Sequence, residues 1–219
     1  MPDSLLQAVS LLFDPAFFLL GAPATWMELL AFVLALIMVA CNIREIHWGW
    51  PLAIVSSLLY FGVFWRSRLY GDAGLQIFFA LMALWGWLQW LRGRRADGST
   101  LQVTNLSPRG RLAALIAQLL LWPAMGWFLA HYTDTDVPWW DGFTTALSIV
   151  GQFLLGRKFV ENWPVWIVVN VVSVALYAYK GLWLTVVLYL VFIALSVVGW
   201  RAWRARAAQG AQPLGEARA

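Results

Sequence analysis

The residues best suited to bind a solute are aromatic and amide side chains on one face of an apolar segment, residues 163–180. Positions i, i+3 and i+7 share a helix face. That face carries two tryptophans, an asparagine, a serine and a tyrosine: Trp163, Trp166, Asn170, Ser173 and Tyr177. Asn170 lies about 10 Å along such a helix, near the middle of a bilayer. Ring faces attract flat or cationic solutes and an amide binds hydroxyl groups, so this stripe predicts a solute pocket.

Other apolar segments carry polar residues that suit the same pocket. We expect its lining to comprise Trp163, Trp166, Asn170, Gln76, Tyr189, Tyr60, Gln152 and Tyr177. The alternative is that such groups hydrogen-bond between helices. We favour that alternative for the serines and threonines, and the pocket for Asn170 and Gln76. For Trp163 and Trp166 both interpretations stay open. The tryptophans nearer the helix ends are expected to anchor the membrane interface: Trp50, Trp87, Trp90, Trp200 and Trp203.

The chain lacks the motifs of common enzymes and metal sites. It contains no H-E-x-x-H, G-x-S-x-G or C-x-x-C pattern, and its histidines, His47 and His131, are far apart. A metal site needs three or four clustered ligands. We therefore expect no enzymatic activity, no cofactor and no bound metal. The apolar segments also hold no confidently buried charged residue, which favours a passive facilitator over a proton-coupled carrier.

The composition indicates that membrane-spanning helices position these residues. Of 219 residues, 62% are hydrophobic and 12% are charged, whereas soluble domains are about a quarter charged. Seven segments approach the ~20 apolar residues of a spanning helix: 25–43, 48–66, 73–92, 110–131, 138–156, 163–180 and 182–200. The expected fold class is an all-α, polytopic membrane protein with the lipid bilayer around it. The basic residues occupy short loops, which argues against a nucleic-acid partner.

The loop charges predict the orientation. Twelve of the 15 Lys+Arg residues fall on the side that holds the loop 93–109 and the C-terminus, and three fall on the other side. Basic residues stay in the cytoplasm, so we expect the N-terminus outside and the C-terminus in the cytoplasm. Residues 4–21 form another apolar stretch, interrupted by Asp14-Pro15. We expect it to be an interfacial or short packed helix, not an eighth span.

An internal repeat organises the seven segments. With a shift of 113 residues, Trp50-Pro51 falls on Trp163-Pro164, and Gly86-Trp87-x-x-Trp90 falls on Gly199-Trp200-x-x-Trp203. Each copy holds three segments, and the segment between the copies restores their orientation. We expect a 3+1+3 arrangement of parallel repeats with the solute between them near the midplane. The units are an N-terminal segment (1–24), two three-helix bundles (25–92 and 137–203), a linker loop and helix (93–136) and a cytoplasmic tail (204–219).

Several of these motifs resemble the PnuC family of bacterial nicotinamide riboside transporters. The resembling stretches include Arg44-Glu45-Ile46 with Trp50, Arg68-Leu69-Tyr70, Leu75-Gln76, both Gly-Trp motifs and the more specific Glu161-Asn162-Trp163-x-x-Trp166-x-x-x-Asn170. They cover about residues 25–205. The resemblance implies a SWEET-like fold, a homotrimer and facilitated diffusion of nicotinamide riboside. Cytoplasmic phosphorylation would then trap the riboside for NAD synthesis.

The resemblance also implies roles for individual residues. Trp163, Trp166 and Asn170 would contact the nicotinamide and the ribose, with Gln76 and Tyr189 as further contacts. Trp85 stands where a Tyr is common in the family, so the pocket differs on the segment 73–92. Related transporters carry thiamine or riboflavin, and these vitamins are alternative solutes. A non-transporting membrane receptor or scaffold is a third possibility, to be separated by a transport assay.

Overall fold

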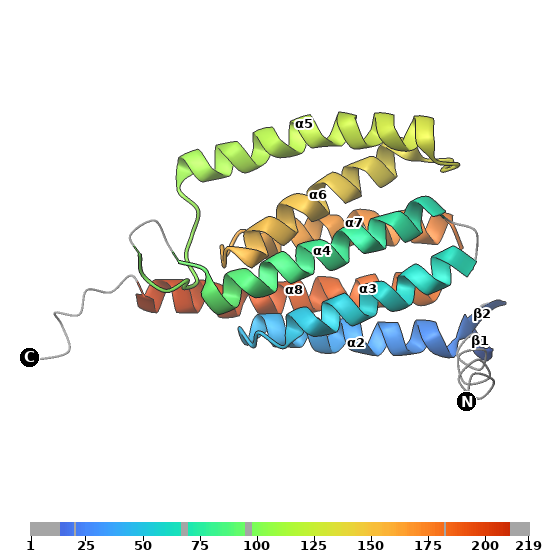
Figure 1. Ribbon diagram of the computed structural model, residues 1–219, viewed down its shortest axis with the longest axis horizontal. Coiled ribbons are helices and arrows are strands. Elements are labelled where there is room, and N and C mark those ends of the chain that lie inside the picture. The colour runs from blue at the N-terminus through green and yellow to red at the C-terminus, as the bar shows by residue number, and fades with distance from the viewer. Residues whose placement is uncertain (1–13, 20, 67–69, 95–97, 182, 211–219) are drawn as a thin grey trace, which may run out of the picture.

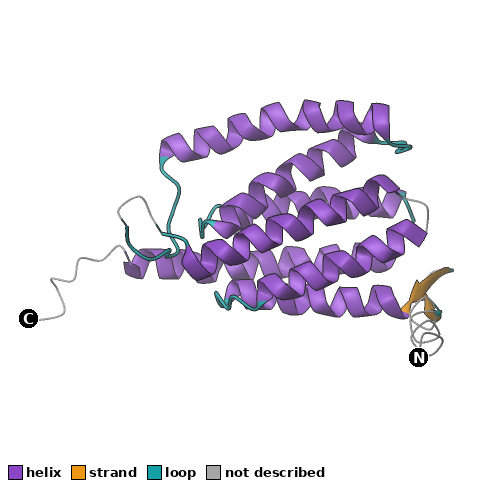
Figure 2. Ribbon diagram, viewed as in Figure 1, coloured by secondary structure: helices purple, strands orange, loops and turns teal. Residues whose placement is uncertain are grey.

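Within the part of the chain that the structure describes, seven helices account for most of the residues, and Figure 2 shows how helix predominates. The computed structural model describes residues 14–19, 21–66, 70–94, 98–181 and 183–210. The helices are α2 (Trp26–Ile43), α3 (Gly49–Arg66), α4 (Tyr70–Arg92), α5 (Pro108–Tyr132), α6 (Pro138–Gly156), α7 (Asn162–Tyr179) and α8 (Trp183–Gly210). The seven predicted helices are therefore confirmed. The one large difference is that α8 continues ten residues beyond the expected end at residue 200.

Five helices are long and apolar enough to cross a membrane: α2, α4 from Gly74 onwards, α5, α7 and α8. Helices α3 and α6, of 18 and 19 residues, lie alongside them (Figure 1). Helix α6 carries more polar residues because much of it faces other helices rather than lipid. Its buried set includes Thr145, Ser148 and three glycines. Intramembrane polar groups face the protein interior in this way.

The helix starts follow local sequence signals. Thr25 caps α2 in extended conformation, and its side chain and that of Glu28 form a capping box. Ser107 caps α5 by accepting a hydrogen bond from the Gly110 N–H, and Pro108 takes the first helical position. Pro138 begins α6 in the same way. These proline and capping residues explain why the observed starts lie close to the predicted ones.

The expected N-terminal helix is wrong for the residues that the structure describes before α2. Strands β1 (Pro15–Leu19) and β2 (Ala22–Thr25) pair in an antiparallel hairpin instead. Pro15 and Pro23 disfavour a helix interior. Gly21 has φ +86°, a conformation that glycine adopts readily in tight turns. The remainder of the predicted helix, residues 4–13, lies outside the described residues.

The helices pack as two groups of three. In what we call the first half, α3 packs on α2 and α4, and in the second half α7 packs on α6 and α8. The halves meet where α4 contacts α6 and where α2 contacts α8. Helix α5 packs on the outer side of α6 (Figure 1). We keep the full 3+1+3 membrane arrangement as an inference, supported by this grouping.

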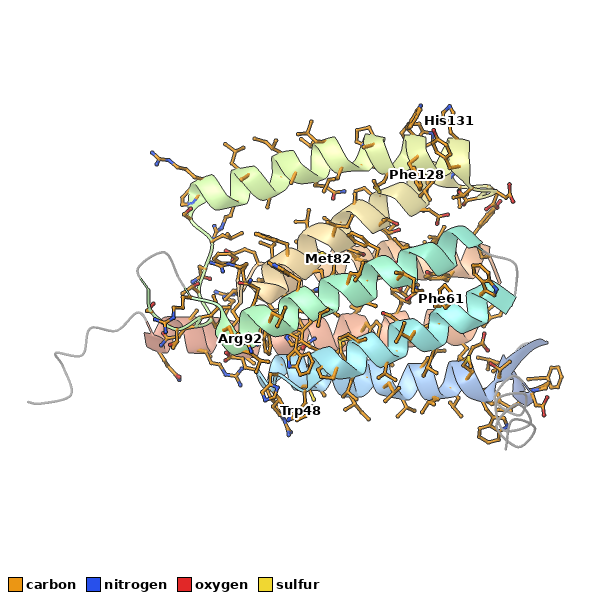
Figure 3. The ribbon with its side chains drawn as sticks, in the orientation of Figure 1. Trp48, Phe61, Met82, Arg92, Phe128 and His131 are labelled. Atoms are coloured by element: carbon orange, nitrogen blue, oxygen red, sulfur yellow. The ribbon has the colours of Figure 1, made fainter. Side chains whose placement is uncertain are left out.

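One end of the bundle concentrates basic residues, and we call it the basic end. Helices α2, α4 and α6 end there at Arg44, Arg92 and Arg157, and α8 runs out past it (Figure 1). Figure 3 shows Arg92 at this end, with Phe61 and His131 toward the opposite end. The linker between α4 and α5 crosses the basic end, where the Thr104 N–H donates to the Lys158 carbonyl at 3.1 Å.

Candidate solute-binding site

A buried amide lies halfway along α7. Asn170 is 2% exposed, and its Nδ2 donates to the Ser196 hydroxyl of α8 at 3.3 Å. Ser196 is itself 3% exposed. A carboxamide offers two N–H groups and one oxygen, and this bond uses one N–H. The amide is therefore held in place by α8.

A tyrosine cluster lies on the side of Asn170 away from the basic end. The Tyr177 and Tyr189 rings are 5.2 Å apart, and the Tyr189 hydroxyl hydrogen-bonds with the side chains of Tyr177 and Ser173. From the first half, Tyr60 lies close enough to Tyr189 for an electrostatic interaction. The structure thus gathers predicted site residues from α3, α7 and α8 into one aromatic, hydroxyl-bearing cluster.

Trp166 occupies a position between α7 and α6. A Cβ atom on Gly151 of α6 would lie 3.2 Å from the Trp166 ring, so the absence of a side chain there lets the indole approach α6. The other predicted amides, Gln76 on α4 and Gln152 on α6, are half-buried. That Gln76 faces Asn170 across the two halves stays a prediction.

Trp163 belongs to a layer of tryptophans near the basic end rather than to the tyrosine cluster. It is 2% exposed and packs edge-on against Trp203 at 5.5 Å and 89°. Trp50 and Trp90 make the same contact in the first half, at 5.4 Å and 84°. The Trp90 and Trp203 rings lie 6.2 Å apart and join the two pairs. We call Trp50, Trp90, Trp163 and Trp203 the tryptophan layer.

The prediction that the helix-end tryptophans anchor the membrane interface is wrong for Trp50 and Trp203. Trp50 is 1% exposed and Trp203 is 0% exposed, while Trp87, Trp90 and Trp200 pack against the same core cluster. The physical reason is that α8 continues to Gly210 and the linker packs Val103, which is 7% exposed, into that cluster. Positions that look terminal in the sequence are therefore interior.

Two glycines make this packing possible. A Cβ on Gly86 would lie 2.3 Å from the Trp50 ring, and a Cβ on Gly199 would lie 2.6 Å from the Trp163 ring. The shift of 113 residues relates the two glycines and the two tryptophans. The tryptophan of each Trp-Pro motif thus packs on the glycine of a Gly-Trp motif, and this contact occurs once in each half.

The described interior is polar but uncharged. Its buried polar side chains are Asn42, Ser56, Gln118, Thr145, Ser148, Asn162, Asn170, Ser173 and Ser196. Over the described ranges, no three His, Cys, Asp or Glu side chains gather as metal ligands. Such an interior suits hydrogen bonding to a neutral or singly charged solute, and it offers no buried acid or base for chemistry.

Two residues of the site were missed by sequence reasoning. Ser196 holds the Asn170 amide, and Gly151 makes room for Trp166. Ser196 falls on Ala83 in the repeat, so the comparison of the two copies does not point to it. Only its spacing from Tyr189, two helical turns away on α8, offered a signal.

The fold and the site indicate a class of protein, which we state first, and the family follows from the sequence match. An all-α bundle of apolar helices around a neutral, ring-flanked polar site is a multi-pass membrane protein of the kind that moves small solutes. The chain belongs to the nicotinamide mononucleotide transporter family, whose model matches residues 25–205. The resemblance to PnuC transporters is thereby confirmed, and so is the prediction that the chain is not an enzyme.

Individual proteins with similar sequences support this family assignment. The chain is 31% identical to the riboflavin/roseoflavin transporter RibM of Streptomyces davaonensis, over 91% of this chain and 94% of that protein. It is 24% identical to the nicotinamide riboside transporter PnuC of Escherichia coli, over 84% of this chain and 87% of the relative. The crystal structure of the vitamin B3 transporter PnuC has a TM-score of 0.72 at 23% identity, covers 93% of this chain and 88% of the other, and supports the fold.

Proposed function

We propose that this protein is a passive facilitator of nicotinamide riboside uptake. The observation that supports the proposal is the buried Asn170 amide, held by Ser196, with Trp166 about one turn before it and Tyr177, which pairs with Tyr189, two turns after it along α7. Indole and phenol rings attract a flat pyridinium cation. The amide and hydroxyl groups match the carboxamide and ribose hydroxyls of the solute.

The neutral interior supports a passive mechanism. Coupling to protons requires a titratable group inside the membrane, and the buried polar side chains of the described residues are all uncharged. Net uptake would then depend on removal of the free riboside, which cytoplasmic phosphorylation achieves. The solute would feed NAD synthesis by this route.

We also infer the placement and assembly of the protein. The distribution of basic residues supports a bacterial inner membrane with the N-terminus outside and the C-terminus in the cytoplasm. The family resemblance supports a homotrimer. The units 25–92 and 137–203 would be its moving bundles, with 93–136 as the connection between them.

Uptake by proteoliposomes tests the proposal. Labelled nicotinamide riboside should equilibrate across the membrane without an imposed proton or sodium gradient. Asn170→Ala and Trp166→Ala should each weaken binding by about tenfold or more, because each removes a contact to a buried solute. Trp127→Ala is the matched control, since Trp127 is 52% exposed on α5. Uptake that strictly requires an ion gradient would contradict the passive mechanism.

Riboflavin is the second candidate solute. The observation that favours it is the 31% identity to RibM, against 24% to PnuC of Escherichia coli. Riboflavin combines a flat ring system with a polyhydroxylated chain, so the same ring and amide contacts suit it. Competition of unlabelled riboflavin, thiamine and nicotinamide riboside against labelled riboside distinguishes the three. Stronger inhibition by riboflavin would assign the site to that vitamin.

A further inference from the structure

The bonds between the two halves at the basic end have a reciprocal pattern. The Trp90 indole of the first half donates to the Leu155 carbonyl of α6 at 3.2 Å. The Trp203 indole of the second half donates to the Asn42 carbonyl of α2 at 3.2 Å. The shift of 113 residues relates the two donors and also the two acceptors. Each half therefore binds the other through the same contact.

These carbonyls lie at helix C-termini, where backbone oxygens lack partners within the helix. Helix α2 ends in a Schellman turn, in which the Ile46 N–H donates to the Cys41 carbonyl at 2.9 Å. Helix α6 ends in the equivalent turn, with the Phe159 N–H donating to the Leu154 carbonyl at 2.9 Å. Each of the two carbonyls already accepts an N–H within its own turn, from Glu45 at 3.2 Å or Lys158 at 3.0 Å, and the indole adds a second donor from the opposite half.

In each turn, the residue with the left-handed backbone conformation is charged, and the two charged side chains pair with each other. Glu45 has φ 58° and Lys158 has φ 57°, a region that glycine occupies more readily than residues with side chains. Their side chains form an ion pair at 2.9 Å, and the Lys158 ammonium also lies 4.8 Å from the centre of the Trp90 ring. Strained residues that make a specific contact point to a functional role.

We propose that the tryptophan layer and the Glu45–Lys158 pair form the closed gate of the solute path at the basic end. The gate opens when both indole–carbonyl bonds, the bonds of Arg206 to Glu45 and the Ile43 carbonyl, the Glu45–Lys158 pair and the Arg157–Gln89 bond break together, which lets the halves separate there as three-helix units. The hydrogen bonds are individually modest, and the Glu45–Lys158 pair beside the buried tryptophans is partly exposed. The proposal depends on the chain being a transporter and not on which vitamin it carries.

Thiol accessibility tests the gate without measuring transport. In a Cys41→Ser background, Ser173→Cys places a reporter thiol on α7, where the native serine is 3% exposed. A membrane-impermeant cationic methanethiosulfonate is added to inside-out or right-side-out vesicles. Trp90→Phe and Trp203→Phe should each accelerate modification from the basic-end face by about three- to tenfold, the factor that one lost hydrogen bond represents. Modification from the opposite face should not accelerate.

The matched control is Trp122→Phe. Trp122 also donates its indole N–H to a carbonyl, that of Trp139 at 2.9 Å, but this bond joins α5 to α6 within one side of the molecule. Its modification rate should equal that of the parent. Equal acceleration from both faces, or acceleration by Trp122→Phe as large as by Trp203→Phe, would overturn the gate and indicate general loosening.

A second pair of variants covers the case in which the tryptophan variants fail to fold. Glu45→Gly and Lys158→Gly remove the ion pair while glycine keeps the left-handed turn, so folding should be retained. Each should accelerate modification from the basic-end face. Unchanged rates in these folded variants would overturn the proposal, and loss of solute binding alone would not bear on it.

Discussion

At the scale of single residues, Ser196 controls the orientation of the Asn170 amide. The Ser196 hydroxyl accepts the Asn170 Nδ2 hydrogen bond at 3.3 Å, and both residues are buried. Ser196→Ala removes that bond, so the amide loses its fixed direction toward the solute. We expect solute binding to weaken by about fivefold, which corresponds to ~1 kcal/mol for one neutral hydrogen bond. Isothermal titration of the purified protein measures the change.

The control for Ser196→Ala is Ser56→Ala. Ser56 is 6% exposed and donates to the Ala31 carbonyl at 3.2 Å, so it loses a similar buried bond away from the site. It should alter thermal stability more than solute affinity. Equal losses of affinity in both variants would show that Ser196 acts through stability alone.

The glycines that contact the Trp50 and Trp163 rings lead to a second prediction at the residue scale. Gly86→Ala and Gly199→Ala place a methyl group within 2.3 Å and 2.6 Å of an indole ring. Such overpacking costs about 1–3 kcal/mol, so both variants should unfold at a lower temperature in detergent. Gly74→Ala on α4 meets open space and should instead gain about 1 kcal/mol from helix propensity. Unchanged melting of the first two variants would contradict the observed packing.

The polar residues of the site were more predictable than the tryptophans. Asn170, Tyr177 and Tyr189 could be selected because a polar side chain deep in an apolar helix faces inward. Trp50 and Trp203 were misassigned, since tryptophan is common both at membrane interfaces and in cores. Which of the two applies depends on the neighbouring helix, and helical spacing alone does not show that.

At the scale of elements, hydrophobic length predicted every helix of the described chain and failed at the hairpin. A segment of about 20 apolar residues has to be helical in lipid, because its backbone groups find no other partners there. The stretch before α2, residues 4–21, is interrupted by Asp14-Pro15, so its apolar content did not decide between helix and strand. The pairing of β1 with β2 was not visible in the spacing.

Besides the Thr104 backbone bonds and the packing of Val103, one carboxylate holds the linker between α4 and α5, and this yields an element-scale prediction. Glu161 accepts the Leu106 N–H at 2.9 Å and pairs with Arg111 at 2.9 Å. Glu161→Ala should release the linker and accelerate hydrogen exchange of the Leu106 amide by about tenfold, as expected when a hydrogen bond to a charged group is lost. Arg109→Ala, at the same helix start, should leave that exchange rate unchanged. Slow exchange in Glu161→Ala would show that other contacts hold the linker.

At the scale of the whole molecule, the two halves are joined most visibly at one end. Trp90 and Trp203 bind carbonyls of the opposite half there, and Arg157 donates to the Gln89 side chain at 2.9 Å. An arrangement of two similar units joined by polar bonds at one end is suited to a rocking motion that exposes a central site to alternate faces. In the mechanism that we propose, the Asn170 amide, halfway along α7, would be reached from both faces in turn.

The orientation of the whole molecule is the last prediction. In the sequence, twelve of the 15 Lys+Arg residues fall in the loops and the tail that the charge pattern assigns to the cytoplasmic side, and the loop between α5 and α6 on the other side carries Asp134 and Asp136. Because basic loops remain in the cytoplasm, green fluorescent protein fused after Ala219 should fluoresce. Alkaline phosphatase fused after Asp134 should be active, and after Gly98 inactive. The reverse pattern would place the basic end outside the cell, so the gate that we propose there would face the solute's entry rather than its exit.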